Sequence, residues 1–182
     1  MTEVDFAKKI ALLGDPKVGK TSIQERYLGL GFSMIYKPTL GANFSIKDYH
    51  KQDKLIRVTI LDLAGHPNFK PIRKHHFKGV SGCLLVFDVT RPFNPDKQIL
   101  PWVREVMEYT NQNGLPLAVV GNKIDLDFIR QVPIYDGFNA ATDARLEMNQ
   151  QFAVDYFETS AKEGEGVTEA FEWLIETIMA EI

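Results

Sequence analysis

Apolar residues along the chain predict several buried strands and one half-buried hairpin. Phe6–Leu13 predicts a buried strand, and so do Cys83–Val89 and Leu115–Val120, which are almost uninterrupted apolar runs. Ala42–Lys47 instead alternates apolar and polar residues, as a half-buried strand does. Because a polar turn separates it from the apolar run Leu55–Leu61, the two segments predict an antiparallel hairpin.

Helical periodicity predicts four helices. Ser22–Leu28 and Ala144–Phe152 are short, whereas Asn94–Asn113 and Gly166–Met179 are long and amphipathic. In the helix over Asn94–Asn113, Pro101 marks either the first turn of the main body or a kink, and Gly114 ends the helix. The inner faces consist of Trp102, Val103, Val106, Met107 and Tyr109 in the first long helix, and of Val167, Ala170, Phe171, Leu174, Ile175 and Ile178 in the second.

Three segments carry neither pattern clearly. Gly29–Gly41 contains three glycines and a proline, and a loop of this length in a compact domain is usually functional. Residues 66–79 are polar and basic, which is typical of a solvated helix face. Residues 127–141 predict a loop, and Tyr156-Phe157 predicts a short strand that follows the second short helix.

Composition limits the class of protein. The 182 residues suit one domain, and a net charge of −3 argues against a nucleic-acid partner bound through overall basicity. Cys83 is the only cysteine, so a disulfide framework and a cysteine metal cluster are excluded and a cytoplasmic location is expected. Thr2 excludes myristoylation and residues 179–182 contain no prenylation cysteine, so we expect no lipid anchor, and a location peripheral to membranes only if a tail is missing. We also expect a monomer.

Residues 14–21 match the phosphate-binding pattern Gly-x-x-x-x-Gly-Lys-Thr between a predicted strand and a predicted helix. Gly14 and Gly19 permit turns in which successive backbone N–H groups face one anion. Lys20 supplies positive charge to the β- and γ-phosphates, and the Thr21 hydroxyl can ligate Mg²⁺. The alternative, a chance glycine-rich turn, is disfavoured by the strand–loop–helix order. The expected phosphate contacts are Gly14, Asp15, Pro16, Lys17, Val18, Gly19, Lys20, Thr21 and Ser22.

Two further motifs stand at the ends of predicted strands. In Asp62-Leu63-Ala64-Gly65, Asp62 can position Mg²⁺ through a water molecule, and the Gly65 N–H can approach a γ-phosphate. In Asn122-Lys123-Ile124-Asp125, the Asp125 carboxylate can accept hydrogen bonds from guanine N1–H and N2–H. Adenine offers neither donor, a mismatch that can cost a factor of about 10⁴ to 10⁵ in specificity. A plain polar turn is the alternative for each motif, but their order after the phosphate loop favours guanine nucleotides.

The ordered motifs, with Tyr-x-Pro-Thr before Asp62 and Glu-Thr-Ser-Ala-Lys near the C-terminus, resemble the small GTPases of the Ras and Rab type over nearly the whole chain. The resemblance implies one domain over residues 1–182, an α/β fold with a doubly wound, mostly parallel six-stranded sheet containing one antiparallel strand and flanked by helices. It implies GTP and GDP as ligands with Mg²⁺, and slow hydrolysis that resets switch I (about 30–41) and switch II (about 63–79). Effectors, exchange factors and GTPase-activating proteins are the implied partners of these switches.

The resemblance also assigns roles by position. Thr39 matches the switch I threonine that ligates Mg²⁺ and senses the γ-phosphate. Phe32 matches the aromatic residue that packs against guanine, and Tyr36 matches the tyrosine that covers the phosphates. The implied catalytic residues are Lys20, Thr39, Gly65 and His66.

Ser160, Ala161 and Lys162 match the last base-binding loop of these GTPases. The resemblance places the Ala161 N–H at guanine O6 and the side-chain stems of Lys123 and Lys162 on the two faces of the ring. The segments 39–44 and 87–90 resemble the Rab branch, although Leu61 stands where Rab proteins have tryptophan.

Departures from the family pattern occur at the catalytic centre. His66 replaces the glutamine that orients the attacking water, as in translation-factor GTPases, and a neutral imidazole has a single acceptor nitrogen. Pro16 and Lys17 replace glycines of Ras, and the Pro16 ring would lie where the arginine of an activating protein enters. These departures leave open a hydrolysis-deficient scaffold that holds GTP. A phosphate-loop ATPase or nucleotide kinase is disfavoured by Asp125.

Overall fold

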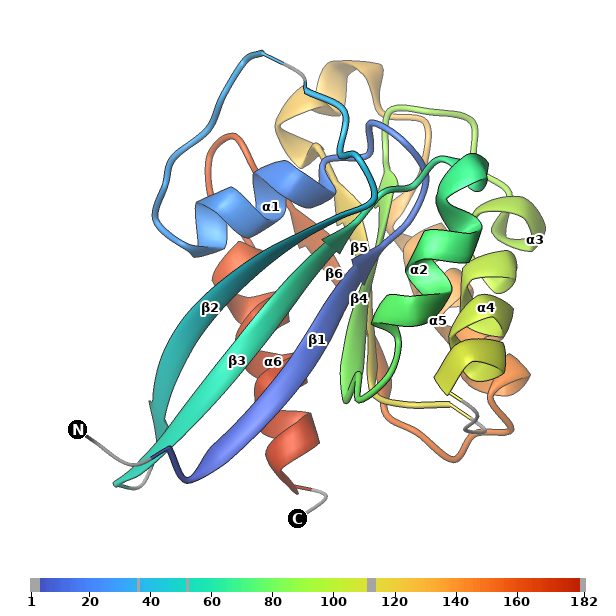
Figure 1. The fold of residues 1–182 in the computed structure, drawn as a ribbon. Coiled ribbons are helices and arrows are strands. Elements are labelled where there is room, and N and C mark those ends of the chain that lie inside the picture. Colours follow the sequence, from blue (N-terminus) through green and yellow to red (C-terminus); the bar gives the residue numbers. More distant parts are fainter. Residues whose placement is uncertain (1–3, 36, 52, 111–113, 181–182) are drawn as a thin grey trace.

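The protein forms one six-stranded sheet with the strand order β2-β3-β1-β4-β5-β6 (Figure 1). The computed structural model describes residues 4–35, 37–51, 53–110 and 114–180. β2 runs antiparallel to β3, and all the other neighbouring strands are parallel, which confirms the fold class expected from the sequence. The strands are β1 (Phe6–Leu13), β2 (Ala42–Lys51), β3 (Lys54–Leu63), β4 (Gly82–Asp88), β5 (Leu117–Asn122) and β6 (Val154–Thr159).

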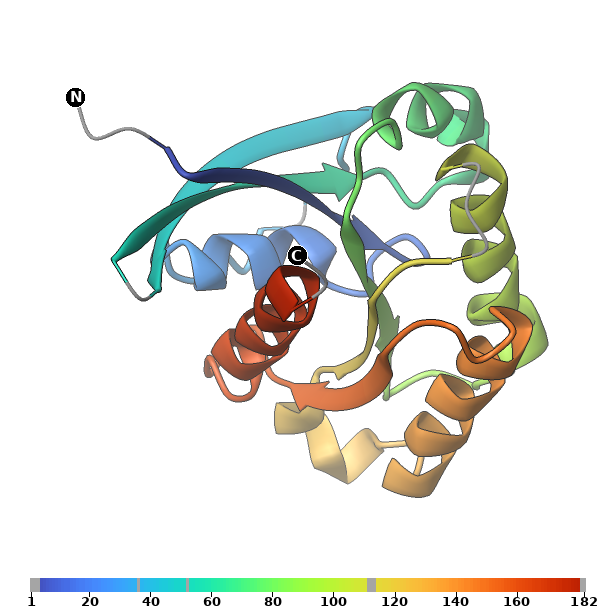
Figure 2. The same cartoon turned by 90° about the horizontal axis from the view of Figure 1, so that it is seen from below.

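Helices cover both faces of the sheet, as Figure 2 shows from below. α1 and α6 lie on one face, and α2, α4 and α5 lie on the other. Among the described residues, no helix is long and apolar enough to cross a membrane. The helices are α1 (Lys20–Tyr27), α2 (Lys70–His76), α3 (Pro95–Gln98), α4 (Leu100–Thr110), α5 (Ile134–Glu147) and α6 (Val167–Ala180), with 3₁₀ turns η1 (Pro67–Phe69) and η2 (Ile124–Ile129).

The strand register brings the motif residues to one edge of the sheet. Asp62 on β3 is paired with Leu12, just before the phosphate loop. Asp88 on β4 pairs with Asn122 on β5, and Asn122 pairs in turn with Thr159 on β6. Because these strands are parallel, their carboxyl ends meet at the same edge, where ligands of open α/β sheets bind.

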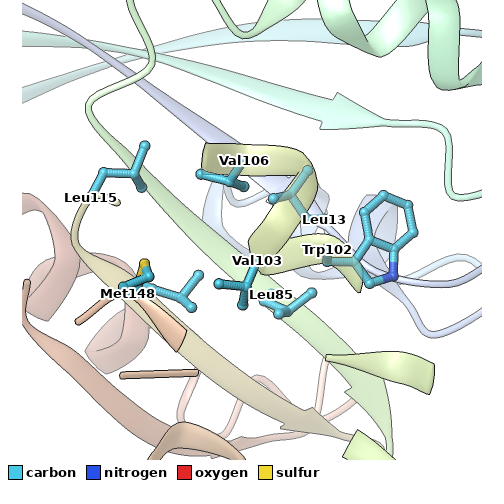
Figure 3. A pocket seen from close by; sticks show the side chains of 8 residues that line it. Leu13, Leu85, Trp102, Val103, Val106, Leu115 and Met148 are labelled. Carbon is cyan, nitrogen blue, oxygen red and sulfur yellow. The ribbon is translucent and has the colours of Figure 1, made fainter. Parts of the chain in front are cut away.

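Where the sequence predicts one helix over Asn94–Asn113, the described residues 94–110 contain two helices, because Ile99 interrupts the segment with a φ of −116°. α4 starts at Leu100, so Pro101 lies in its first turn, one of the two predicted positions; residues 111–113 lie outside the described part of the chain. The predicted inner residues Trp102, Val103 and Val106 are buried. They pack between α4 and the sheet, where the gap between side chains leaves no room for a water molecule (Figure 3).

The predicted loop over residues 127–141 is wrong in its second half. α5 already begins at Ile134 and ends at Glu147, whereas the sequence predicts a helix over Ala144–Phe152. The hydrophobic pattern of the sequence does not reveal α5, because this helix buries small residues and exposes large ones. The buried residues are Gly137, Ala140, Ala141 and Ala144, and the exposed large residues are Ile134, Tyr135, Phe138 and Leu146.

Candidate functional site

A pocket of about 1050 Å³ lies at the carboxyl edge of the sheet. Six parts of the chain line it: the phosphate loop with the start of α1, switch I, switch II, Arg91 after β4, the segment after β5 and the last base-binding loop. Among the residues expected from the sequence, the lining includes Pro16, Lys17, Gly19, Lys20, Thr21, Ser22, Phe32, Thr39, Gly65, His66, Asn122, Lys123, Asp125, Ala161 and Lys162. Gly14, Val18, Asp62 and Ser160 are buried and Asp15 is half-buried, while Tyr36 lies outside the described residues.

Glycine is required at Gly14 and Gly19 for both backbone and space. They have φ values of 127° and 106°, and a Cβ at Gly14 would lie 2.0 Å from the Val86 carbonyl oxygen. The Lys20 ammonium group donates to the Gly14 and Asp15 carbonyl oxygens at 2.7 and 2.8 Å. Burial lowers the pKa of Lys20 to about 8, although the charges of Asp62 and Asp15 act to raise it. The loop therefore holds the Lys20 ammonium group in a fixed position, where a bound anion would stabilise its positive charge.

Three side-chain oxygens meet between the phosphate loop, switch I and β3. The Thr21 hydroxyl donates to Asp62 Oδ2 at 2.5 Å, and the Thr39 hydroxyl donates to the same oxygen at 3.0 Å. The two hydroxyl oxygens are 3.1 Å apart. Burial raises the pKa of Asp62 against the effect of these hydrogen bonds. Asp62 Oδ1 is buried and has no partner within the described ranges. Hard oxygen groups with one unsatisfied carboxylate oxygen fit Mg²⁺ and its water molecules.

The opposite end of the pocket carries Asp125. The Ser160 hydroxyl donates to Asp125 Oδ1 at 2.7 Å and thereby orients the carboxylate. Lys123 has a left-handed backbone with a φ of 75°, and its ammonium group binds Asp88 Oδ2 at 2.6 Å. Burial acts to raise the pKa of Asp88, but hydrogen bonds from Lys123 and Thr90 hold it below its ordinary value. The stem of Lys123 is therefore held along the pocket by an ionised carboxylate.

Asn122 connects the phosphate loop to the last base-binding loop. Its side-chain amide donates to the Val18 carbonyl at 2.8 Å, and its Oδ1 accepts from Thr159 and from the Ala161 N–H at 3.1 and 3.2 Å. The Ala161 N–H is therefore bonded to Asn122 in this structure, and its contact with guanine O6 stays a prediction. Arg26 supports the same loop from α1 by donating to the carbonyls of Ala161 and Lys162.

Switch II begins directly against the phosphate loop. A Cβ at Gly65 would lie 2.4 Å from the Gly14 carbonyl oxygen and 2.8 Å from Lys20 Nζ, so this position accepts only glycine. His66 is exposed, and its Nδ1 accepts the N–H of Asn68 at 3.3 Å. In a neutral ring that is bonded in this way the proton is on Nε2, because one imidazole nitrogen donates and the other accepts.

The sequence does not reveal several residues that support this site. Arg73 belongs to the basic segment expected on a solvated face, but it is buried and ion-paired with Glu105. Trp102 is buried as expected, yet its indole N–H donates to Asp15 Oδ1 at 3.1 Å. Arg91 binds Asp88 at 3.0 Å and donates to the Pro16 carbonyl at 3.2 Å. A single sequence shows the type of each residue but not its partner in space, so these pairs could not be predicted from it.

Known proteins resemble this chain over nearly its whole length. Residues 9–180 match the Ras family. The chain is 34% identical over 180 residues to Ras-related protein RabC of Dictyostelium discoideum, which covers 98% of this chain and 87% of that protein. It is 36% identical to Ras-related protein Rab7 of Drosophila melanogaster over 167 residues, which covers 90% of this chain and 76% of that protein.

A third relative extends the likeness to vertebrates. Ras-related protein Rab-3D of Homo sapiens is 33% identical over 174 residues, which covers 96% of this chain and 75% of that protein. The expected resemblance to the Ras and Rab type is thereby confirmed. The motifs lie at the strand ends where the expected fold requires them, and the chain belongs to the Ras family of small GTPases.

Proposed function

We propose that this GTPase is a guanine-nucleotide switch that binds GDP and GTP with Mg²⁺ through a single domain formed by residues 1–182. The observation that carries the proposal is the convergence of Thr21, Thr39 and Asp62 at one end of a pocket whose other end holds Asp125. The first three residues suit a metal beside the phosphates, and the fourth suits guanine. When bound, Mg²⁺ neutralises phosphate charge.

Switch I is the segment that changes state in this proposal. Thr39 is hydrogen-bonded to Thr21 and Asp62, whereas the neighbouring apolar side chains Met34 and Leu40 are 84% and 81% exposed. A segment with so little burial has low local stability. Loss of the γ-phosphate would remove a contact of Thr39 and release residues 30–41. Because the Ala64 N–H donates to the Gly41 carbonyl at 2.9 Å, release would also reach the start of switch II.

Hydrolysis in this proposal relies on positioned charge and on a positioned water molecule. Lys20 and the Gly65 N–H stabilise negative charge on the γ-phosphate, and Thr39 accompanies them in the GTP state. His66 lines the pocket at the position where related GTPases orient water. With Nδ1 engaged by Asn68, the ring contributes a donor at Nε2 and no acceptor for the water proton, so hydrolysis is slow.

Effectors, exchange factors and activating proteins are proposed to bind the switch surface. Leu40 in switch I, Phe44 and Ile46 on β2, and Ile72 on α2 are exposed apolar side chains, which suits a protein-binding surface. Gly41 and Ile72 are neighbours, so switch I and switch II contribute to one continuous area. We propose that the chain acts as a monomer in the cytoplasm and binds no nucleic acid.

A persistent GTP-bound scaffold is the second candidate. It is favoured by the engaged Nδ1 of His66 and by Pro16, whose carbonyl accepts a hydrogen bond from Arg91 at the edge of the pocket. Both features hinder water activation or entry of an arginine from an activating protein. The two candidates share the nucleotide site and differ only in the rate at which GTP is lost.

Nucleotide extraction and single-turnover hydrolysis test both candidates. Protein purified without added nucleotide is denatured, and the released nucleotide is separated by chromatography: GDP supports the switch, and GTP supports the scaffold. The purified protein is then loaded with GTP and followed with and without Mg²⁺. Release of an adenine nucleotide, or of no nucleotide together with no measurable GDP binding, would overturn both.

A further inference from the structure

We propose that Arg73 is a positioning residue for GTP hydrolysis, which sets the direction of the Gly65 N–H and is itself oriented by Glu105 and Trp102. The inference rests on the proposed function, because it assigns the Gly65 N–H to the γ-phosphate. It adds a link from switch II through α4 to the phosphate loop, built from residues outside every motif of the sequence.

Arg73 holds the two carbonyl groups on either side of Gly65. Its Nη1 donates to the Ala64 carbonyl at 2.9 Å and to the His66 carbonyl at 3.0 Å. The Ala64 carbonyl and the Gly65 N–H belong to one peptide group, which is planar and in the trans form directs them to opposite sides. A guanidinium that fixes the carbonyl therefore also fixes the N–H.

Gly65 has no freedom to compensate for a displaced peptide group. It lies against Gly14 and Lys20 so closely that a Cβ would be 2.4 Å from the Gly14 carbonyl oxygen and 2.8 Å from the Lys20 ammonium nitrogen. A rotation of the Ala64–Gly65 peptide would thus displace the donor relative to the Lys20 charge. Small misplacements of this kind are costly, because the donor must meet charge that develops in the transition state.

The guanidinium of Arg73 is held in turn by α4. Its Nε and Nη2 donate to the two carboxylate oxygens of Glu105 at 2.6 and 3.0 Å, and the two side chains are only 3% and 8% exposed. The remaining nitrogen, Nη1, donates to the carbonyl oxygens of Ala64 and His66. Arginine suits this arrangement because its donors form a rigid planar fork, which the single ammonium group of lysine does not reproduce.

Trp102 extends the link to the phosphate loop. The Arg73 guanidinium carbon lies 4.6 Å from the centre of the Trp102 ring, and the indole N–H donates to Asp15 Oδ1 at 3.1 Å. The Asp15 carbonyl accepts a hydrogen bond from Lys20, so Asp15 contacts both Trp102 and Lys20. Figure 3 shows the Trp102 indole at the edge of the group of apolar side chains, with its nitrogen pointing away from them.

Arg73→Lys is the primary test, with Arg104→Lys as the matched control. Arg104 forms a similar two-bonded pair with Glu147 on α5, away from the pocket. Each variant is loaded with GTP and followed in a single turnover. We expect Arg73→Lys to hydrolyse about 10-fold more slowly or worse, with GDP and GTP affinities within about threefold of wild type, because the base and phosphate-loop contacts remain. Arg104→Lys should match wild type.

Trp102 fluorescence supplies a readout that a purely structural ion pair would not move. The chain has two tryptophans, and Trp173 packs against Phe157 on the other side of the sheet. In Trp173→Phe, exchange of GDP for a non-hydrolysable GTP analogue should change the Trp102 emission. In the double variant with Arg73→Lys, this change should fall to less than about half. The reason is that the cation at position 73 would no longer stay over the Trp102 ring and move with switch II.

Glu105→Gln covers the case in which Arg73→Lys does not fold, since it keeps shape and one acceptor oxygen; it should slow hydrolysis in the same direction. A lowered melting temperature with a rate within about twofold of wild type would overturn the proposal. An emission that is identical with the two nucleotides would also overturn it, even in a protein that does not hydrolyse GTP. Failure of the proposed function is distinguishable, because it appears as loss of guanine-nucleotide binding in the wild-type chain.

Discussion

The Thr21 hydroxyl lies 2.5 Å from Asp62 Oδ2, while the second oxygen of the same carboxylate is buried and has no partner in the described segments. An unpaired buried carboxylate oxygen is costly unless a donor or a metal completes it. The pair therefore predicts that bound Mg²⁺, through its water molecules, satisfies Asp62 and couples metal to nucleotide retention.

Asp62→Ala should release GDP quickly, and removal of Mg²⁺ should no longer accelerate release. Loss of a residue that holds a metal through its outer shell typically weakens metal binding by about 10- to 100-fold. The measurement is the dissociation rate of a fluorescent GDP with Mg²⁺ and with a chelator. Asp48→Ala is the control, because Asp48 is exposed on β2 and pairs with Arg57. A chelator effect of wild-type size in Asp62→Ala would contradict the assignment.

Asp125→Asn should weaken guanine binding and improve xanthine binding. The amide replaces one of the two acceptors with a donor, and a mismatched buried hydrogen bond costs a factor of up to about 10⁴ to 10⁵. Competition of GDP and XDP against a fluorescent nucleotide measures the exchange of preference. Asp127→Asn makes the same chemical change two residues further on, at a side chain that is 80% exposed, and should bind GDP as wild type does. Unaltered GDP affinity in Asp125→Asn would refute the role in base selection.

The sheet and the pocket could be predicted from the sequence because their determinants are local. Apolar runs define the buried strands, and each nucleotide motif directly follows a strand or precedes a helix, so the register alone brings Asp62 and Asn122 to one edge. The limits of that reasoning are visible in α5. Its inward residues are glycine and alanine, which a hydrophobic pattern does not distinguish from a loop.

The features of the site that the sequence did not predict depend on pairs of residues that are distant in sequence. Arg73 looks like any other cation of its basic segment, and it becomes buried because Glu105, 32 positions later, neutralises it. Trp102 follows the apolar pattern of α4, but its indole N–H requires a polar partner, and Asp15 supplies it from the phosphate loop. Residue type predicts that such partners exist and not where they lie.

Gly137→Ala should destabilise the protein even though alanine is the better helix former. Propensity alone predicts a gain of about 0.5–1 kcal/mol. A Cβ at this position, however, would lie 2.1 Å from the Tyr156 ring, which stacks on Phe87 and donates to Glu158. Overpacking of this kind typically costs about 1–3 kcal/mol. Urea unfolding measures the difference, and Asn139→Ala, at an exposed position of the same helix, should show no such loss. A Gly137→Ala variant more stable than wild type would contradict this prediction, because it would show that the Tyr156 ring moves aside for the new methyl group.

His66 is expected to be a weak substitute for glutamine because of the tautomer that its neighbour selects. Asn68 donates to Nδ1, so the neutral ring presents a donor at Nε2, whereas the amide of glutamine both donates to and accepts from water. His66→Gln should therefore raise the single-turnover rate by about 10-fold or more above a wild-type rate at or below roughly 10⁻⁴ s⁻¹. His66→Ala should lose no more than about threefold, since one weak donor disappears.

The exposed His75 on α2 provides the control, because His75→Gln makes the same exchange outside the pocket and should leave the rate unchanged. All rates come from protein loaded with GTP and followed to completion at saturating Mg²⁺. A fall of about 100-fold in His66→Ala would contradict the donor assignment, because a loss of that size requires a group that orients or deprotonates the water. No gain in His66→Gln would instead place the obstacle elsewhere, at Pro16, whose ring and missing N–H alter the phosphate loop beside the same water.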